Sequence, residues 1–252
     1  MKRPLALQKD SPTPFYYQIR DIIQEKITTN EWAPGTKIPS ERELCDLIKV
    51  SRTTVRQAIN SLVHEGVLVR VPGKGTFVNQ PKLVQPVNRF YSFSDSLKRR
   101  NMTSRVQVIS LSLQLANKNQ QRILNLPPGD SVYELVRLRF GNQEPLLLER
   151  TILPAARFPN LELRDFEQRR LYDVMGNDYG IRLGVAQEAF EPVLVDSYEA
   201  GLLQVPPQSP ALLIERVTLD NESRPVEWTK GVFRGDRCRY YVELSVPSDD
   251  AI

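Results

Sequence analysis

The sequence has few of the residues that build disulfide frameworks and metal sites. Among its 252 residues it has two cysteines, Cys45 and Cys238, and one histidine, His64. Two cysteines this far apart exclude a disulfide framework and a cysteine-based zinc site, so a reduced, cytosolic protein is the simplest interpretation. We therefore expect no metal ion and no cofactor, and a single histidine leaves little material for catalysis.

Long apolar runs are absent as well. No stretch approaches the ~20 apolar residues that a transmembrane helix needs, so no membrane partner is expected. The chain begins with two basic side chains, Lys2 and Arg3, but no apolar core or small-residue cleavage site follows, which argues against a signal peptide. With 40% apolar and 25% charged residues, the composition is that of a globular protein with one large domain or two ordinary ones.

The positive charge is unevenly distributed. Residues 1–80 hold 12 Lys and Arg against 8 Asp and Glu (12 − 8 = +4), whereas residues 81–252 hold 22 of each. The first third therefore carries the whole net charge, which indicates a part that faces nucleic acid. Charge alone is equally compatible with an ordinary basic surface.

The first third of the chain shows helical periodicity. Apolar residues at three- and four-residue spacing predict a helix within 14–30. Ser40 followed by Glu43 is the pattern of a capping box and predicts the start of a second helix. Ser51 is in position to cap a third helix, and Gly66 fits the left-handed position that ends it.

After Gly66 the apolar period changes from 3.6 to 2. The segments VLVRV and TFV then read as two short strands joined by the turn PGKG. A helix, a helix-turn-helix and a β-hairpin within about 80 residues predict a winged helix-turn-helix domain at residues 1–78.

The stretch VSRTTVRQA places arginine where an isolated helix disfavours it. A helix start carries a partial positive charge, yet Arg52 lies in the first turn and Arg56 one turn later. In a helix-turn-helix this start lies against base edges, where arginine can bind guanine with two hydrogen bonds. Thr53 and Thr54 can bond phosphates or contact a thymine methyl group. The alternative is that these are solvated charges on a helix surface.

The segment PSERELCDLIKVSRTTVRQAINSLVHEGVLVRVPGKGTFV resembles the DNA-binding half of bacterial transcription regulators of the GntR family. The resemblance implies a cytoplasmic bacterial protein that associates with the nucleoid when it binds double-stranded operator DNA. It also implies a set of DNA-binding residues, with Ser51 as the helix cap: Arg42, Ser51, Arg52, Thr53, Thr54, Arg56, Gly73 and Lys74.

The rest of the chain predicts a linker and an α+β domain. Pro81 and Pro86 disfavour helix, so residues 79–89 read as a linker between domains. From residue 90 to 248, strand and helix patterns alternate and predict an antiparallel sheet with helices. Strands are expected at 104–115, 131–141, 145–153, 181–195, 211–220, 225–233 and 237–246, and helices at 117–126, 163–180 and 197–205.

Charged positions in two of these strands predict a ligand site. Arg137 and Arg139 lie on one face of their strand, and two parallel guanidinium groups repel each other unless an anion lies between them. The alternative is an exposed face paired with acids such as Glu149 or Glu134. Glu227 shares a strand face with Thr229 and Phe233, and its alternative role is a salt bridge to a neighbouring strand.

The segments SFSDSLKRRNM, VYELVRLRFGNQEPLLLERTILP, LYDVM and PVEWTKGVFRGDRCRYYVEL resemble the HutC subfamily. This subfamily has a chorismate-lyase-like effector domain, the UTRA domain, and the resemblance implies dimerisation through it. In this chain Arg170 replaces a small hydroxyl residue, and Phe233 replaces an aromatic hydroxyl residue found in amino-sugar binders. The implied effector-binding residues are Ser92, Phe93, Arg137, Arg139, Glu149, Arg170, Tyr172, Glu227 and Phe233.

These features predict a ligand-responsive transcription regulator. The resemblance implies a homodimeric repressor that binds a pseudo-palindromic operator and is released by a small anionic metabolite such as a sugar phosphate. An activator of the same family is the first alternative. A lyase-like enzyme that uses the C-terminal fold is the second, and the absence of a metal cluster or a nucleophile motif in the sequence argues against it.

Overall fold

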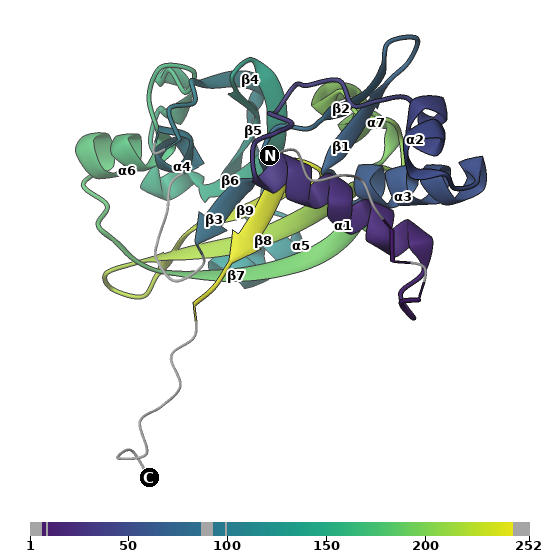
Figure 1. The fold of residues 1–252 in the computed structure, drawn as a ribbon. Helices are drawn as coiled ribbons and strands as arrows, with labels where there is room; N and C mark the ends of the chain where they lie inside the picture. Colours follow the sequence, from purple (N-terminus) through teal and green to yellow (C-terminus); the bar gives the residue numbers. More distant parts are fainter. Residues whose placement is uncertain (1–6, 9, 87–92, 99, 244–252) are drawn as a thin grey trace, which may run out of the picture. The chain divides into compact units, whose positions relative to one another are not determined.

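The computed structural model describes residues 7–8, 10–86, 93–98 and 100–243. The chain divides into two compact units, residues 1–82 and 83–252, which are described separately below (Figure 1). The division lies inside the segment that the sequence predicts to be a linker.

The first unit consists of three helices and a hairpin. The strands β1 and β2 pair antiparallel, with Leu68 opposite Val78, and β2 also forms a bridge from Phe77 to Lys37. Apolar residues from all three helices close a core between the helices and the hairpin. The elements are α1 (Phe15–Thr28), α2 (Glu41–Ile48), α3 (Arg52–His64), β1 (Leu68–Val71) and β2 (Gly75–Val78).

The helix boundaries of this unit follow from the capping residues. The Ser40 hydroxyl accepts a hydrogen bond from the Glu43 backbone N–H, and the Glu43 carboxylate accepts one from the Ser40 backbone N–H, which completes the predicted capping box. Ser51 likewise accepts from the backbone N–H of Thr54 at 3.2 Å. Gly66 has φ +71°, the left-handed conformation expected at the end of α3.

Replacing Ser51 by alanine is expected to destabilise the start of α3 by about 1 kcal/mol, because it removes the acceptor for a first-turn N–H. Amide hydrogen exchange in the first turn of α3 measures the effect. Thr53→Ala is the matched control, since Thr53 is exposed in the same turn and does not cap the helix. Equal exchange rates in the two variants would contradict the capping role.

The second unit is built on a six-stranded antiparallel sheet with the strand order β4-β5-β6-β9-β8-β7. Two short strands, β3 and β10, form a separate parallel pair. The strands are β3 (Leu83–Pro86), β4 (Ser104–Leu115), β5 (Ser131–Gly141), β6 (Glu144–Pro154), β7 (Leu183–Leu194), β8 (Pro210–Asp220), β9 (Pro225–Arg234) and β10 (Cys238–Tyr241).

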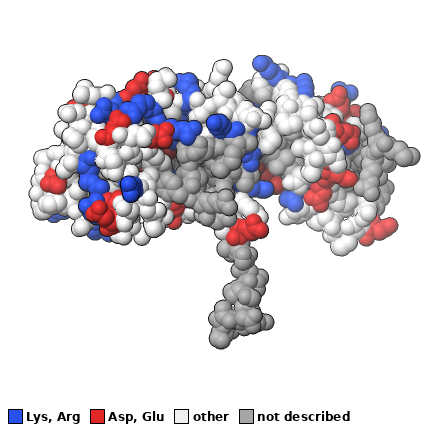
Figure 2. Space-filling model, turned by 90° about the vertical axis from the view of Figure 1, so that its left-hand side faces the viewer, with Lys and Arg blue, Asp and Glu red and all other residues white. Residues whose placement is uncertain are grey.

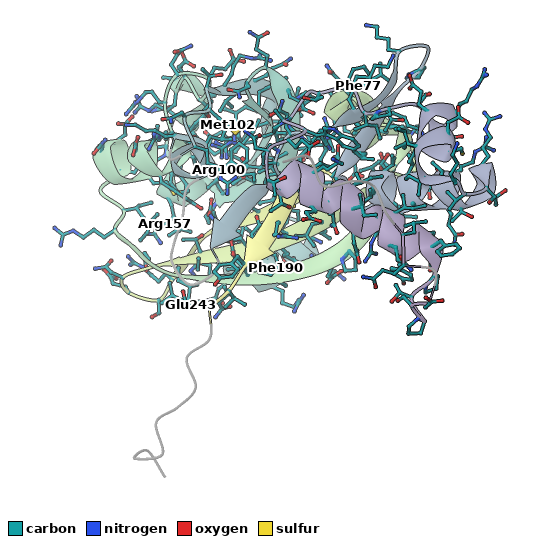
Figure 3. The ribbon with its side chains drawn as sticks, in the orientation of Figure 1. Phe77, Arg100, Met102, Arg157, Phe190 and Glu243 are labelled. Atoms are coloured by element: carbon teal, nitrogen blue, oxygen red, sulfur yellow. The ribbon has the colours of Figure 1, made fainter. Side chains whose placement is uncertain are left out.

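Helices cover both faces of this sheet. On one face, α6 (Leu171–Tyr179) packs on apolar side chains of β5 and β6, and α4 (Phe93–Lys98) packs beside it on β6 and β9. On the opposite face lie α5 (Lys118–Leu124) and α7 (Ser197–Leu203). Met102 and Phe190, labelled in Figure 3, are partly buried and pack against the apolar cluster around α4.

The structure corrects three secondary-structure predictions. Part of the predicted linker is the strand β3, which pairs with the distant β10 and whose Leu83 side chain is buried. The predicted helix at 163–180 begins only at Leu171, and β10 ends at Tyr241 without joining the large sheet. The helix α4 was not predicted. The α+β class and the other predicted elements agree with the structure.

Candidate functional site

The predicted DNA-binding residues lie at the start of α3, on α2 and in the hairpin turn. The side chains of Arg52 and Arg56 are 71% and 51% exposed, and Thr53 is exposed beside them. Arg42 is exposed on α2, and Lys74 is exposed in the turn between β1 and β2. Gly73 precedes Lys74 with φ +71°, a conformation that side chains disfavour.

The two arginines at the start of α3 converge on one carboxylate that the sequence did not single out. Glu41, the first residue of α2, accepts a hydrogen bond from Arg56 Nε at 3.1 Å and pairs with Arg52 Nε at 3.5 Å. Its other oxygen accepts from Arg70 Nη2 at 3.1 Å. Arg70 lies on the hairpin strand β1, outside the two predicted helices. The sequence therefore gave no reason to group it with Arg52 and Arg56. In the sequence, the residues around Glu41 indicated only the capping of a helix by Ser40.

The second unit contains a cavity of about 570 Å³ over the sheet face that carries α4 and α6. Its floor comes from β5, β6, β8 and β9, because strand register aligns Arg137 with Glu149, Glu149 with Gly231 and Gly231 with Ile214. A cavity of this size suits a small metabolite. Gly231 lies at the centre of this floor. A Cβ at that position would lie only 3.0 Å from Leu147 Cδ1, so a larger residue would crowd its neighbour.

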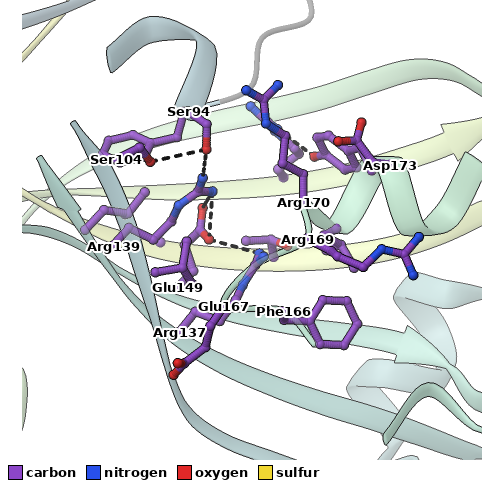
Figure 4. A pocket seen from close by; sticks show the side chains of 18 of the residues that line it. Ser94, Ser104, Arg137, Arg139, Glu149, Phe166, Glu167, Arg169, Arg170 and Asp173 are labelled. Carbon is purple, nitrogen blue, oxygen red and sulfur yellow. Dashed lines mark hydrogen bonds and ion pairs between the residues drawn. The ribbon is translucent and has the colours of Figure 1, made fainter. Parts of the chain in front are cut away.

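Arg137 and Arg139 share a single carboxylate in this cavity (Figure 4). Glu149 Oε2 lies 3.0 Å from Arg137 Nη2 and 3.2 Å from Arg139 Nη1. Arg139 Nη2 also donates to Ser94 Oγ at 2.7 Å, and its guanidinium lies over the Phe93 ring. The prediction that both arginines share a face is therefore confirmed, and Glu149 is one of the two acids considered as their partner.

Burial and charge act in opposite directions on this group. Burial alone would raise the pKa of Glu149, but the positive charges of Arg139, Arg137 and Arg216 outweigh burial and hold that pKa below its usual value. Burial lowers the pKa of Arg139, and Glu149 opposes that shift. Among the described residues, neither Arg137 Nε nor Arg139 Nε has a hydrogen-bond partner, although both atoms are buried. Two guanidiniums for one carboxylate leave one positive charge in excess.

A second polar group occupies another part of the same cavity wall. The Tyr172 hydroxyl donates to Glu227 Oε1 at 2.6 Å, and Thr218 Oγ1 donates to the same oxygen at 2.6 Å. Arg216 donates to the Tyr172 hydroxyl at 2.7 Å and to Glu188 at 2.6 Å. Burial, followed by the nearby Glu227 carboxylate, raises the pKa of Tyr172, so its hydroxyl stays protonated at neutral pH. The salt bridge considered for Glu227 is replaced by hydrogen bonds from two hydroxyls.

Most other predicted effector residues also line the cavity. Phe93 and Phe233 are buried with their ring centroids 5.5 Å apart, and Arg170 lies on the wall at the start of α6. Ser92 lies outside the described residues. Glu134 pairs with Arg150 and does not line the cavity.

Sequence reasoning missed many of the residues that line the cavity, and three polar or charged side chains among them are informative. Ser94 contacts Arg139, and it stands two residues beyond the serine that the family resemblance indicated. Arg216 lies between Glu215 and Val217 in the otherwise largely apolar strand β8 and was not singled out. Lys98 lies at the end of the unpredicted helix α4 and gave no separate signal.

Two negative observations hold for the residues that the structure describes. No group of three or more His, Cys, Asp or Glu in this part of the chain is arranged to hold a metal ion. None of the helices within it has the length and apolar character needed to cross a membrane.

Comparison with known proteins places both units in known families. Residues 15–78 match the bacterial regulatory proteins of the gntR family, and residues 99–239 match the UTRA domain. The HTH-type transcriptional repressor NagR of Bacillus subtilis (strain 168) is 34% identical over 92% of this chain and 96% of its own length. The histidine utilization repressor of Pseudomonas aeruginosa is 30% identical over 86% of each chain. The chain belongs to the HutC subfamily of the GntR family.

Solved structures and curated relatives agree with this membership. The crystal structure of PhnF from Mycobacterium smegmatis matches this GntR-family chain with a TM-score of 0.65 and 27% identity, over 90% of this chain and 99% of PhnF. The predicted fold class, a helix-turn-helix unit followed by an antiparallel sheet with helices, is confirmed. Because the relatives are transcriptional repressors, the lyase-like alternative is wrong.

Proposed function

We propose that this GntR-family chain is a homodimeric repressor that binds a pseudo-palindromic operator and leaves it when a small anionic metabolite occupies the UTRA cavity. It would act in the bacterial cytoplasm, on nucleoid DNA. The names of the relatives, which are repressors, support repression over activation. Residues 1–78 would be the DNA-binding domain, residues 79–89 the connection, and residues 90–248 the effector-binding and dimerisation domain.

One observation supports the proposal that the effector is an anion: two buried guanidinium groups share one carboxylate at the cavity floor. Desolvated guanidinium groups are costly unless each is paired and hydrogen-bonded. The Nε atoms of Arg137 and Arg139 have no partner among the described residues, so their hydrogen-bonding capacity is incompletely used. A phosphate or carboxylate beside Glu149 would supply acceptors and balance the excess charge.

The wall of the cavity supports the same conclusion. Of its lining residues, six are Lys or Arg and four are Asp or Glu (6 − 4 = +2). Figure 2 shows lysine and arginine side chains gathered with acidic ones on one face of the molecule. The helix α6 begins at this wall with Arg170 as N-cap, and arginine has no acceptor with which to cap a helix. The first N–H groups of α6 therefore favour an anion there.

A sugar phosphate fits both polar groups of the cavity. Its phosphate would bind Arg137 and Arg139, and its hydroxyls would donate to Glu227, whose carboxylate has more acceptor sites than its two hydroxyl donors fill. Phe233 adds an apolar floor and no hydroxyl, which argues against the recognition of an amino sugar by an aromatic hydroxyl at this position.

The effector must bind the two states of the regulator unequally to release DNA. Coupling between an effector site and a DNA site typically amounts to about 1–3 kcal/mol, enough to change operator occupancy several-fold or more. Dimerisation through the UTRA domain would make this coupling act on both DNA-binding domains at once.

We expect a phosphorylated sugar to raise the thermal midpoint of the full-length protein and to release it from the operator. A thermal-shift screen of phosphorylated sugars, amino sugars, phosphonates and small carboxylates measures the first effect. The best ligand is then added to a complex of the protein with its selected duplex, and fluorescence anisotropy measures release.

Arg137→Gln is the matched variant for this screen. It removes the excess positive charge and leaves Arg139 and Glu149 as a balanced pair, so the fold should persist while the ligand-induced shift disappears. DNA binding without ligand should remain. Stabilisation by neutral sugars alone, or full stabilisation of Arg137→Gln, would contradict the anion site.

A further inference from the structure

We propose that Glu41 is a positioning residue for DNA readout, which orients Arg52, Arg56 and Arg70 so that they meet the DNA as one preformed group. This inference rests on the proposed DNA-binding function of the first unit. It concerns a carboxylate that would not itself contact DNA, and it adds the hairpin strand residue Arg70 to the residues that face the duplex.

The geometry joins three elements through one side chain. Glu41 Oε2 lies 3.1 Å from Arg56 Nε and 3.5 Å from Arg52 Nε, both on α3. Glu41 Oε1 lies 3.1 Å from Arg70 Nη2 on β1. The Glu41 side chain is 21% exposed, whereas the three arginine side chains are 44–71% exposed. The carboxylate is thus covered by the guanidinium groups, which remain open to solvent.

An acidic residue here works against generic DNA affinity. Each Lys or Arg that neutralises a phosphate adds to sequence-independent binding, and a nearby carboxylate subtracts from it. A carboxylate that binds the Nε side of Arg56 and Arg52 leaves their terminal nitrogens available for acceptors. Arginine reads guanine with those planar, forked donors, so fixing the fork reduces the conformational entropy lost on binding. The arrangement therefore favours base discrimination at the expense of non-specific affinity.

A second role for Glu41 must be separated from this one. Glu41 lies in the first turn of α2, where a negative charge stabilises the helix through its dipole. Glu41→Asp keeps that charge in the first turn but shortens the side chain, which withdraws it from the arginines. Asp46→Asn removes one negative charge from the same helix, and Asp46 is exposed away from the three ion pairs.

The experiment compares the full-length wild type with Glu41→Gln, Glu41→Asp and Asp46→Asn. The wild type first selects its duplex from a random-sequence library. Fluorescence anisotropy at one fixed salt concentration then gives affinities for the selected duplex and for a scrambled duplex. We expect Glu41→Gln to lower the ratio of the two affinities by roughly 5- to 150-fold, the equivalent of one lost bidentate contact. Affinity for the scrambled duplex should stay equal or rise.

The controls make each outcome decisive. Glu41→Asp should also lose discrimination while its thermal midpoint stays near that of the wild type, and Asp46→Asn should leave the ratio unchanged. If both Glu41 variants keep the wild-type ratio of affinities for the selected and the scrambled duplex, the positioning role is overturned and the proposed DNA-binding function is not. A repeated selection with Glu41→Gln that alters one base pair only would mean direct base contact by Glu41 and would overturn positioning. A wild type that selects no sequence would overturn the proposed function, and this inference with it.

Discussion

Replacing Glu149 by alanine is expected to lower the unfolding free energy of the UTRA domain by about 3–5 kcal/mol, because it leaves two buried guanidinium groups without their carboxylate. Arg137 and Arg139 both pair with this residue and are themselves almost completely buried. Their mutual repulsion would then act without compensation. Urea denaturation of the variant and the wild type measures the loss.

The same variant should gain an anion site. The space of the missing carboxylate lies between two guanidinium groups, which are suited to bind a tetrahedral oxyanion. Inorganic phosphate should therefore stabilise Glu149→Ala more than it stabilises the wild type, and thermal unfolding with and without phosphate tests this. The control is Glu134→Ala, which removes a carboxylate whose partner Arg150 is 59% exposed and should cost about 1 kcal/mol or less. Equal losses in the two variants would show that the buried group is not energetically special.

The sequence identified Arg137, Arg139 and Glu149 as candidate site residues, but it did not determine how they pair. The alternation in VRLR was enough to place Arg137 and Arg139 on one face, because side chains on a strand alternate strictly. Glu149 remained one of two possible partners until the hairpin register aligned it with Arg137. Arg216 arrives from β8, a strand far along the chain, and no local pattern reports which distant strands lie side by side.

The wrong predictions have local physical causes. The segment before α6 has helical composition, but Asp165 accepts hydrogen bonds from the backbone N–H groups of Glu167 and Gln168 and so forms a turn that competes with helix. The strand β3 is short and ends at Pro86, and it exists because the Leu83 N–H donates to the Arg237 carbonyl. That partner cannot be read from the sequence around Leu83.

In the first unit, by contrast, the sequence predicted the helix boundaries correctly. Its boundaries depend on local chemistry, since Ser40, Ser51 and Gly66 act on backbone groups within four residues. Such features are visible in the sequence, and they agree with the structure. The convergence of three arginines on Glu41 depends on the packing of α2, α3 and β1, and only the structure shows it.

Replacing Arg52 by alanine is expected to weaken operator binding by about 1–3 kcal/mol and to relax base choice at the position that it reads. The Arg52 side chain is 71% exposed in the free protein and its contact with Glu41 is the longest of the three, at 3.5 Å. Its removal should therefore change the stability by less than about 0.5 kcal/mol. A loss of affinity without a loss of stability would assign the energy to DNA contact. Anisotropy with the selected duplex, together with urea denaturation, measures both.

Lys74→Ala provides the contrast that separates base readout from backbone attraction. Lys74 lies exposed in the hairpin turn beside Gly73, where the chain can approach a phosphate closely. Its removal should weaken all duplexes similarly and reduce the slope of log affinity against log salt by about 1, whereas Arg52→Ala should lower the selectivity. Arg150→Ala removes the same charge from the UTRA domain and should change neither quantity. If Arg52→Ala leaves operator binding intact, α3 is not the recognition helix, because its first turn would then carry an arginine that neither the helix dipole nor the DNA favours.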